Sequence, residues 1–361
     1  MTKYIITDQF PGGNITVDSI SDNYVVLSIN NRDSKPWFYW AFKVCGAAGQ
    51  SITFDFGKDV VGYFGAAVSH DLENWQWSEP DRIRADEKER CSFTYTFSET
   101  EDEVYFAHNM LYNVGAFEKV DFMEKTTLCN DSGGTPVPLA AMGEGENVIL
   151  LTARHHACEA PASYVLEGVL REFYQNPLKN YRILAVPFVD MEGVIAGDQG
   201  KGRIPHDHNR DYIQDSIYPT VRAIKELLAK ENIKYVFDFH DPMHIGGGSD
   251  WIRLVNTYES MRDDMNLLSC FFDEETKAEG KEKCLAFTDG RIVWREKPVE
   301  GTFSAYCGAC TSVDFVATIE MPYFGEPDNM MTQQRYVVSG RAFGRAVKRF
   351  MEAKAQKEGE L

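Results

Sequence analysis

The stretch Asn147–Gln175 contains a strand pattern, a polar turn and a helix pattern in that order: NVILLTARHHACEAPASYVLEGVLREFYQ. Its first seven residues are mostly apolar, which is typical of a strand buried on both faces. After Pro161 the apolar residues fall at helical spacing, at Val165, Leu166, Val169, Leu170 and Phe173. A buried strand followed by an amphipathic helix is the repeating unit of an α/β domain, which this stretch therefore predicts.

The same alternation continues downstream. Apolar strand patterns recur in YRILAVPFV (181–189), KYVFDFH (234–240) and VDFVATIE (313–320). Helix patterns recur in SIYPTVRAIKELLAK (216–230) and in the last segment, which starts at Gln333. We therefore expect residues 111–361 to form an α/β domain, with a mixed sheet between helices.

Residues 1–110 have a different pattern. Short alternating or aromatic runs such as NITVDSI, YVVLSI, SITFDF and SFTYTF are separated by turn signals such as PGGN and NNRD. Many short strands at this spacing are typical of an antiparallel β-sandwich. We therefore expect a β-sandwich domain in front of the α/β domain.

Composition limits the possible partners of the chain. Its 361 residues are 43% hydrophobic, enough for two domains with apolar cores. The formal net charge of −18 argues against nucleic-acid or anionic-membrane binding, because phosphate contacts need clustered Lys and Arg. There is neither an apolar run of about 18 residues nor a signal-peptide pattern at the start. We therefore expect a cytoplasmic protein whose cysteines are reduced.

Ionisable residues close three of the predicted strands. One strand runs into His155, His156 and Glu159, a second ends at His240, and a third ends at Glu320. Charged groups at the end of an apolar strand are costly unless they are solvated, paired or metal-bound. Ligands in open α/β sheets bind beyond the carboxyl ends of the strands. Three such endings on separate strands therefore suggest one shared site.

Three interpretations of the first cluster are open: a zinc site, a thiol site, or a chance grouping on a loop. A catalytic zinc takes three protein ligands and keeps a fourth position for water. His156 and Glu159 form an H-x-x-E pair, and His240 is the best third ligand, unless it is only hydrogen-bonded at the sheet edge. No base is arranged for a thiol role of Cys158. The CGAC segment (307–310) has redox spacing, but no second pair completes a zinc ribbon.

Several segments, in this order, resemble the zinc carboxypeptidases of the M14 class, specifically their cytosolic branch. They are ARHHACE (153–159), VPFVDMEGV (186–194), DHNR (207–210), DFH (238–240) and TIE (318–320). The N-terminal segments WFYWAFKV, SHDLENWQW and VYFAHNMLY resemble the β-sandwich that precedes the catalytic domain in that branch. The resemblance therefore covers nearly the whole chain, and it implies that residues 111–361 form a carboxypeptidase-like catalytic domain. Departures at Ala157, Cys158, DMEG and HDPMH affect the details of the substrate pocket and remove no ligand.

The resemblance implies roles for the residues at the strand ends. One zinc ion per chain would be held by His156, Glu159 and His240, with Asp207 as an acceptor that orients a zinc histidine. Glu320 would take a proton from the attacking water and deliver it to the leaving amine.

The resemblance also implies a substrate with a free C-terminal carboxylate. Asn209 and Arg210 would bind this carboxylate, since the planar guanidinium matches it bidentately. A further cation would stabilise the oxyanion, and we favour Arg203 over Lys201. A tyrosine would close over the substrate, with Tyr306 as the candidate.

The bond cleaved would be a C-terminal peptide or isopeptide bond. Arg291, Arg295 and Lys297 could pair with an acidic side chain of the substrate. Two other functions stay open: a zinc amidohydrolase acting on an acyl-amino acid, and a non-catalytic binding protein. The sequence leaves the oligomeric state undetermined.

Overall fold

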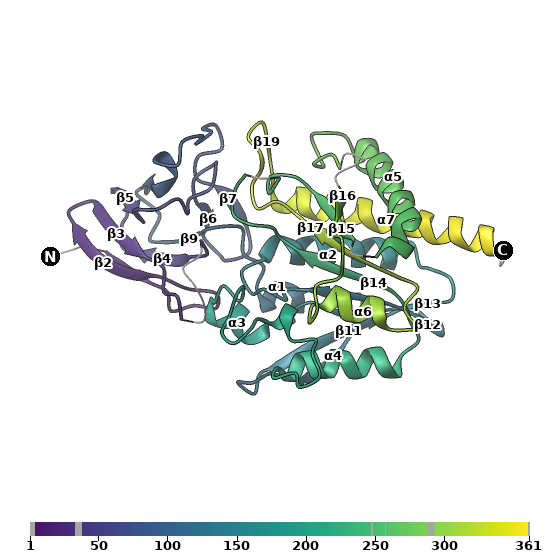
Figure 1. The fold of residues 1–361 in the computed structure, drawn as a ribbon. Helices are drawn as coiled ribbons and strands as arrows, with labels where there is room; N and C mark the ends of the chain where they lie inside the picture. The colour runs from purple at the N-terminus through teal and green to yellow at the C-terminus, as the bar shows by residue number, and fades with distance from the viewer. Residues whose placement is uncertain (1–3, 33–37, 247, 257, 288–291, 360–361) are drawn as a thin grey trace.

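The computed structural model describes residues 4–32, 38–246, 248–256, 258–287 and 292–359. Figure 1 shows the N-terminal sheets at one end of the molecule and the long C-terminal helix at the other, so the two termini lie far apart. Between the termini lies a large mixed sheet with helices around it. No helix within the described ranges is long and apolar enough to cross a membrane.

The N-terminal part contains two sheets. The five-stranded sheet is antiparallel throughout, in the order β1 (Ile5–Thr7), β4 (Ala41–Cys45), β9 (Glu103–Ala107), β6 (Ala67–Ser69), β7 (Trp75–Trp77). The four-stranded sheet has the order β2 (Thr16–Ser21), β3 (Tyr24–Ser28), β5 (Ser51–Asp55), β8 (Ser92–Thr96). Its β3–β5 pair is parallel, which differs from the wholly antiparallel arrangement expected from the sequence.

Aromatic side chains link these two sheets. Phe54 of β5 alternates with more exposed neighbours along its strand and is fully buried. Its ring lies 5.0 Å from that of Phe42 on β4 and 5.5 Å from that of Phe106 on β9. The alternating pattern of the sequence thus places one face of each sheet in a shared aromatic core.

The C-terminal part contains the mixed sheet predicted from the sequence. Its strands are ordered β10 (Glu124–Asn130), β11 (Pro136–Met142), β13 (Tyr181–Val186), β12 (Asn147–Ala153), β14 (Ile233–His240), β17 (Phe315–Glu320), β15 (Arg253–Asn256), β16 (Ile292–Trp294). The central strands β13, β12, β14 and β17 are mutually parallel, while β15 runs antiparallel to β17. The near-continuous apolar patterns therefore belong to parallel central strands, as expected for a sheet covered on both faces.

Helices cover this sheet. The longer ones are α2 (Ala160–Gln175), α4 (Pro219–Lys230), α5 (Arg262–Glu279) and α7 (Gln333–Glu358). Figure 1 shows α2, α5 and α7 close together, with α4 and α6 (Phe303–Ala309) apart from them. Helices α2 and α7 approach closely at two glycines: a Cβ on Gly168 would lie 2.2 Å from the Val337 carbonyl oxygen, and one on Gly340 would lie 2.1 Å from that of Val165.

Shorter elements connect these layers. They are α1 (Val114–Glu118), α3 (Met191–Ala196), the strands β18 (Gly325–Glu326) and β19 (Asn329–Met330), and the 3-10 turns η1 (Glu89–Cys91), η2 (His208–Arg210) and η3 (Glu259–Met261).

The register of the central strands sets the position of the site. Ala153 at the end of β12 is paired with Phe239 of β14, and His240 is paired with Glu320 of β17. On the other side of β17, Glu320 is paired with Arg253 of β15. The polar endings recognised in the sequence therefore meet at one edge of the sheet, as the rule for open α/β sheets predicts.

Candidate metal centre and cavity

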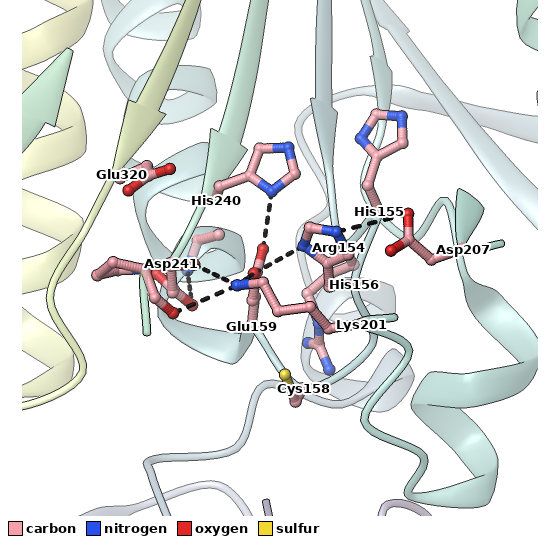
Figure 2. A network of polar contacts seen from close by, with 12 residues as sticks. Arg154, His155, His156, Cys158, Glu159, Lys201, Asp207, His240, Asp241 and Glu320 are labelled. Atoms are coloured by element: carbon pink, nitrogen blue, oxygen red, sulfur yellow. Dashed lines mark hydrogen bonds and ion pairs between the residues drawn. The ribbon is translucent and has the colours of Figure 1, made fainter. Parts of the chain in front are cut away.

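The turn after β12 is held by Arg154, whose φ of 63° lies in the left-handed region. Its buried guanidinium donates hydrogen bonds to the carbonyl oxygens of Ala157 at 2.8 Å and Tyr112 at 3.0 Å. The Cys158 amide donates to the Gln199 carbonyl at 3.1 Å. These bonds fold the turn back on itself, so that Glu159 points toward the end of β14 (Figure 2).

Three buried side chains converge on one point. The Nδ1 atom of His156 lies 2.7 Å from Oε1 of Glu159, and the Nδ1 atom of His240 lies 2.8 Å from Oε2. Ligand atoms of all three lie within 4.8 Å of one another. Figure 2 shows the two imidazoles and the carboxylate pointing toward each other. Two imidazoles and one carboxylate form a donor set that fits a catalytic zinc ion.

Carboxylates lie behind both histidines. The Nε2 atom of His240 is 2.6 Å from Oδ2 of Asp238. The Nε2 atom of His156 is 3.8 Å from Oδ1 of Asp207, and neither atom has a hydrogen-bond partner among the described residues. Such outer carboxylates fix the tautomer and orientation of a metal-binding imidazole. Asp207 is therefore near the position predicted for it, while Asp238 received no role from the sequence.

His155 lies one residue from the predicted ligand and has a different environment. Its Nδ1 atom is 2.9 Å from Asp238 Oδ1, and its Nε2 atom is 2.9 Å from the Tyr212 hydroxyl. A second group of possible ligands, His155, Asp238 and His240, also lies within 4.8 Å. The first group is the better candidate because the Nδ1 atoms of its two histidines face a single carboxylate.

The charge of Glu159 is stabilised by its neighbours. Burial alone would raise the pKa of this carboxyl group, but His156, Lys201 and His240 hold it well below its usual value. The Lys201 ammonium donates to Glu159 Oε1 at 2.6 Å. Burial works to lower the pKa of Lys201, yet Glu159 raises it above the ordinary value, so the ammonium stays charged. The site thus combines an anionic ligand with a partly buried cation.

A cavity of about 300 Å³ opens in front of these side chains. Its polar lining includes the predicted residues His156, Glu159, Asn209, Arg210, His240 and Glu320. Its apolar lining is formed by Met243, Val255, Val293 and Val299. Lys201, Arg253 and Arg295 add positive charge to the same walls. The cavity is therefore locally cationic in a chain whose net charge is −18.

Two of the residues proposed from the sequence lie elsewhere. Arg203 is ion-paired with Asp190 at 3.0 Å and with Asp198 at 3.2 Å, and it does not line the cavity. The buried Asp190 carboxylate holds it there, while Lys201, two residues earlier, reaches the cavity.

Tyr306 lies on α6 and is likewise absent from the cavity lining. Of the three basic residues considered for an acidic substrate, Arg295 lines the cavity and Lys297 is exposed. The third, Arg291, lies outside the described residues.

The thiol interpretation of the cluster has no support in the geometry. Burial raises the pKa of Cys158 to about 12, and its Sγ atom lies 3.6 Å from the Tyr323 hydroxyl, which is no base. Burial also raises the pKa of Cys307 well above its ordinary value. Because the thiolate is the reactive form, both thiols are inert. None of the eight cysteines, all of which lie in the described ranges, forms a disulfide.

Comparison with known proteins adds independent observations. No protein-family model matches the chain. It is 27% identical to human cytosolic carboxypeptidase 4 over 286 residues, and 25% identical to cytosolic carboxypeptidase 6 of Caenorhabditis elegans over 266 residues. A crystal structure of a metallo-carboxypeptidase from Burkholderia cenocepacia covers 98% of this chain and is itself covered completely, with a TM-score of 0.78 at 16% identity. The chain has the metallocarboxypeptidase fold.

These similarities confirm the resemblance to M14 metallocarboxypeptidases of the cytosolic branch, since the two relatives are named cytosolic carboxypeptidases and the solved structure is a metallo-carboxypeptidase. The sequence matches cover 61% and 62% of this chain, but only 26% and 57% of the two relatives' own lengths. The chain thus spans part of the curated relatives that it matches, so its substrate does not follow from theirs.

Proposed function

We propose that the chain is a zinc-dependent metallocarboxypeptidase that hydrolyses the C-terminal peptide or isopeptide bond of a peptide-like substrate. The observation that carries this proposal is the convergence of buried His156, Glu159 and His240 beside a cavity that also contains Glu320 and Arg210. A metal site, a candidate base and a carboxylate-binding cation are the three parts that this reaction requires.

The metal ligands would be His156, Glu159 and His240, which fit one zinc ion per chain by their donor types and convergence. When bound, zinc lowers the pKa of a coordinated water and polarises the scissile carbonyl. Asp238, hydrogen-bonded behind His240, keeps the Nδ1 atom of this ring directed toward Glu159, and Asp207 lies 3.8 Å behind the Nε2 atom of His156.

Proton transfer would be the task of Glu320. Its carboxylate lines the cavity, and its strand position is paired with that of His240. As the general base it takes the proton of the attacking water, and as the acid it then delivers this proton to the leaving amine. Glu320 is not part of either group of possible metal ligands among the described residues, which leaves its carboxylate available for this exchange.

The oxyanion would be stabilised by Lys201. This assignment replaces Arg203, because Lys201 lines the cavity and Arg203 is engaged by two aspartates. A buried cation beside the scissile carbonyl stabilises developing negative charge more strongly than it would in water.

Substrate recognition would rely on Asn209 and Arg210. The Arg210 side chain is exposed at the cavity and has no ion pair with a described residue, so it is available for a terminal carboxylate. Tyr306 stays a candidate for closing over the substrate, since it lies two residues from the cavity-lining Ser304.

An amidohydrolase acting on an acyl-amino acid is the second candidate. It would use the same metal ligands and base, and the cavity volume of about 300 Å³ favours a small substrate. The two functions differ in what lies upstream of the scissile bond, because a carboxypeptidase must accommodate a chain that leaves the cavity. The third possibility, a non-catalytic binding protein, does not account for Glu320 beside the candidate ligands.

The test compares peptides with free and amidated C-termini. Wild-type protein should cleave only the free form, and Arg210→Lys should reduce kcat/KM by about 10- to 100-fold, because the bidentate fork is lost. Arg222→Lys, a change of the same kind on α4 outside the cavity, is the matched control and should have no effect. Equal cleavage of both peptides by the wild type would contradict the carboxypeptidase proposal, and hydrolysis of acyl-amino acids alone would favour the amidohydrolase.

We also propose that the chain divides near residue 110 into two domains, 1–110 and 111–361. The last strand of the N-terminal sheets ends at Ala107, and the next strand, β10, belongs to the mixed sheet. The aromatic contacts between the two N-terminal sheets support a β-sandwich. A cytoplasmic location is proposed from the names of the cytosolic relatives.

A further inference from the structure

Three residues on adjacent strands form a row at the end of the central sheet. His240 of β14 is paired with Glu320 of β17, and Glu320 is paired in turn with Arg253 of β15. The row therefore contains a candidate metal ligand, the candidate base and a guanidinium group on three successive strands of the sheet. Arg253 belongs to none of the motifs quoted in the sequence analysis.

The guanidinium binds the candidate base directly. The Nη2 atom of Arg253 donates to Oε2 of Glu320 at 2.7 Å, and the two side chains are only 20% and 21% exposed. A charge-assisted hydrogen bond in a partly buried wall is stronger and less screened than a surface ion pair. The other carboxylate oxygen, Oε1, has no hydrogen bond with any described residue.

The backbone fixes where this guanidinium can reach. After Arg253, Leu254 and Val255 continue the antiparallel pairing with Ile319 and Thr318 of β17. Leu254 is fully buried, and Val255 contributes to the cavity wall. The Cα atom of Arg253 is thus held by the same sheet that holds Glu320, so the pair is pre-organised.

The cationic residues of the cavity are therefore not equivalent. Arg210 and Arg295 are exposed and have no carboxylate partner among the described residues, so they are available to a substrate. Lys201 is bound to Glu159, yet its ammonium also interacts electrostatically with Glu320.

We propose that Arg253 is a positioning residue for the general base: it holds one oxygen of Glu320 and leaves the other directed toward the attacking water. This inference rests on the proposed function of Glu320. It assigns to Arg253 an effect on the chemical step and not on substrate binding.

The first experiment measures kcat, KM and zinc content for Arg253→Met. We expect kcat to fall by about 10- to 100-fold, as for a misplaced catalytic group, with KM and zinc content close to wild type. Arg253→Lys keeps the charge but not the planar fork, and it should recover part of kcat. Arg295→Met is the matched control. It removes from the same cavity a guanidinium group that is not bound to Glu320. It should change KM and leave kcat intact.

The decisive experiment is a double-mutant cycle with Glu320→Gln. If Arg253 acts through Glu320, Arg253→Met should lower kcat little or not at all when Glu320 is already replaced by Gln. Arg295→Met should lower kcat/KM by the same factor whether or not Glu320 is replaced. Thermal midpoints and inhibitor affinity of all variants separate this result from a general loss of folding.

The outcomes distinguish the inference from the function on which it rests. Full turnover by Glu320→Gln would overturn the proposed base itself. A strong loss in Glu320→Gln together with an independent, multiplicative loss in Arg253→Met would overturn only the positioning role. The positioning role would also be overturned if Arg253→Met raised KM and left kcat unchanged, since Arg253 would then be a substrate-binding residue.

Discussion

Two pairs of largely buried histidines have different neighbours. In the candidate metal centre, the Nδ1 atoms of His156 and His240 lie 2.7 and 2.8 Å from the two oxygens of one carboxylate, Glu159. In the second pair, the two rings contact each other directly: His108 Nε2 lies 2.8 Å from His244 Nδ1. The first pair lines a cavity, whereas the second pair does not line it.

Aromatic rings surround the second pair. Phe38 lies against both imidazoles, at centroid distances of 4.8 Å from His108 and 5.3 Å from His244, and Tyr323 contacts His108 edge-on. The nearest carboxylate, Asp59, lies 3.6 Å from His244 Nε2 and is held by Arg90. His108 follows β9 of the N-terminal sheets and His244 follows β14, so this pair joins the two parts of the chain.

The comparison shows what turns a histidine pair into a candidate ligand set. Both pairs are largely buried, and each has a carboxylate near the far side of at least one ring. Only the first has a carboxylate placed between its two Nδ1 atoms and access to the cavity. The second is a structural contact, in which one neutral ring donates to the other.

The largest expected effect comes from removing one histidine of the first pair. His156→Ala and His240→Ala should each lose most of the bound zinc and nearly all activity, because a catalytic zinc site has three protein ligands. Zinc per chain is measured by elemental analysis of purified protein. Full zinc retention in both variants would show that the ligand assignment is wrong.

The matching changes outside the ligand set are His108→Ala and His155→Ala. Both should keep about one zinc ion per chain. His108→Ala should instead lower the thermal midpoint, because the buried Nδ1 atom of His244 loses its partner. Zinc loss in His155→Ala would move the assignment to the group of His155, Asp238 and His240.

A smaller effect is expected from the carboxylate behind His240. Asp238→Asn keeps the shape of the side chain, but it replaces the charged acceptor of His240 by a neutral amide. Zinc affinity, measured by competition with a chelator, should fall by about 10- to 100-fold. Asp59→Asn changes the carboxylate beside the other histidine pair and should leave zinc affinity unchanged. Equal affinities for Asp238→Asn and wild type would remove Asp238 from the metal centre.

The smallest effect concerns the pH dependence of stability at the second pair. Burial lowers the pKa of His108 well below its ordinary value and also lowers that of His244. Below about pH 6.5 these two histidines therefore bind more protons in the unfolded chain than in the folded one, and their contribution to the free energy of unfolding falls as the pH is lowered from there. Each such histidine contributes up to about 1.4 kcal/mol per pH unit.

His108→Asn should make the unfolding free energy depend less steeply on pH, by an amount that corresponds to the uptake of up to one proton on unfolding. The measurement is urea denaturation between pH 7 and 5. The variant and the wild type are compared at the same zinc saturation, so that loss of metal at low pH does not differ between them. An identical pH dependence would contradict the neutral, buried state of this histidine.

Much of the catalytic part of the fold could be predicted from the sequence. The strand NVILLTA is β12 with its predicted bounds, and the helix pattern after it is α2, which begins at Ala160. The parallel β3–β5 pair could not be predicted, because alternation shows which face of a strand is buried and not which strand lies beside it.

The candidate site was also partly predictable. His156, Glu159, His240 and Glu320 follow apolar strands, and parallel strands end at the same edge of a sheet, so their proximity follows from local patterns. The choice between Lys201 and Arg203 did not follow, because it depends on the buried carboxylate of Asp190, which engages one of two nearby cations.

The sequence by itself determined the order of strands and helices, the candidate ligand types and the resemblance to the cytosolic carboxypeptidases. These properties reside in short segments, where periodicity and residue type act locally. The tertiary structure alone decided which ionic groups meet. Arg253 and Glu320 are 67 residues apart and come together only because β15 pairs antiparallel with β17. Asp238 likewise serves both His155 and His240 only because β14 lies beside β12. Electrostatic contacts depend on distances of a few ångströms, which are set by strand order and register and not by the local sequence.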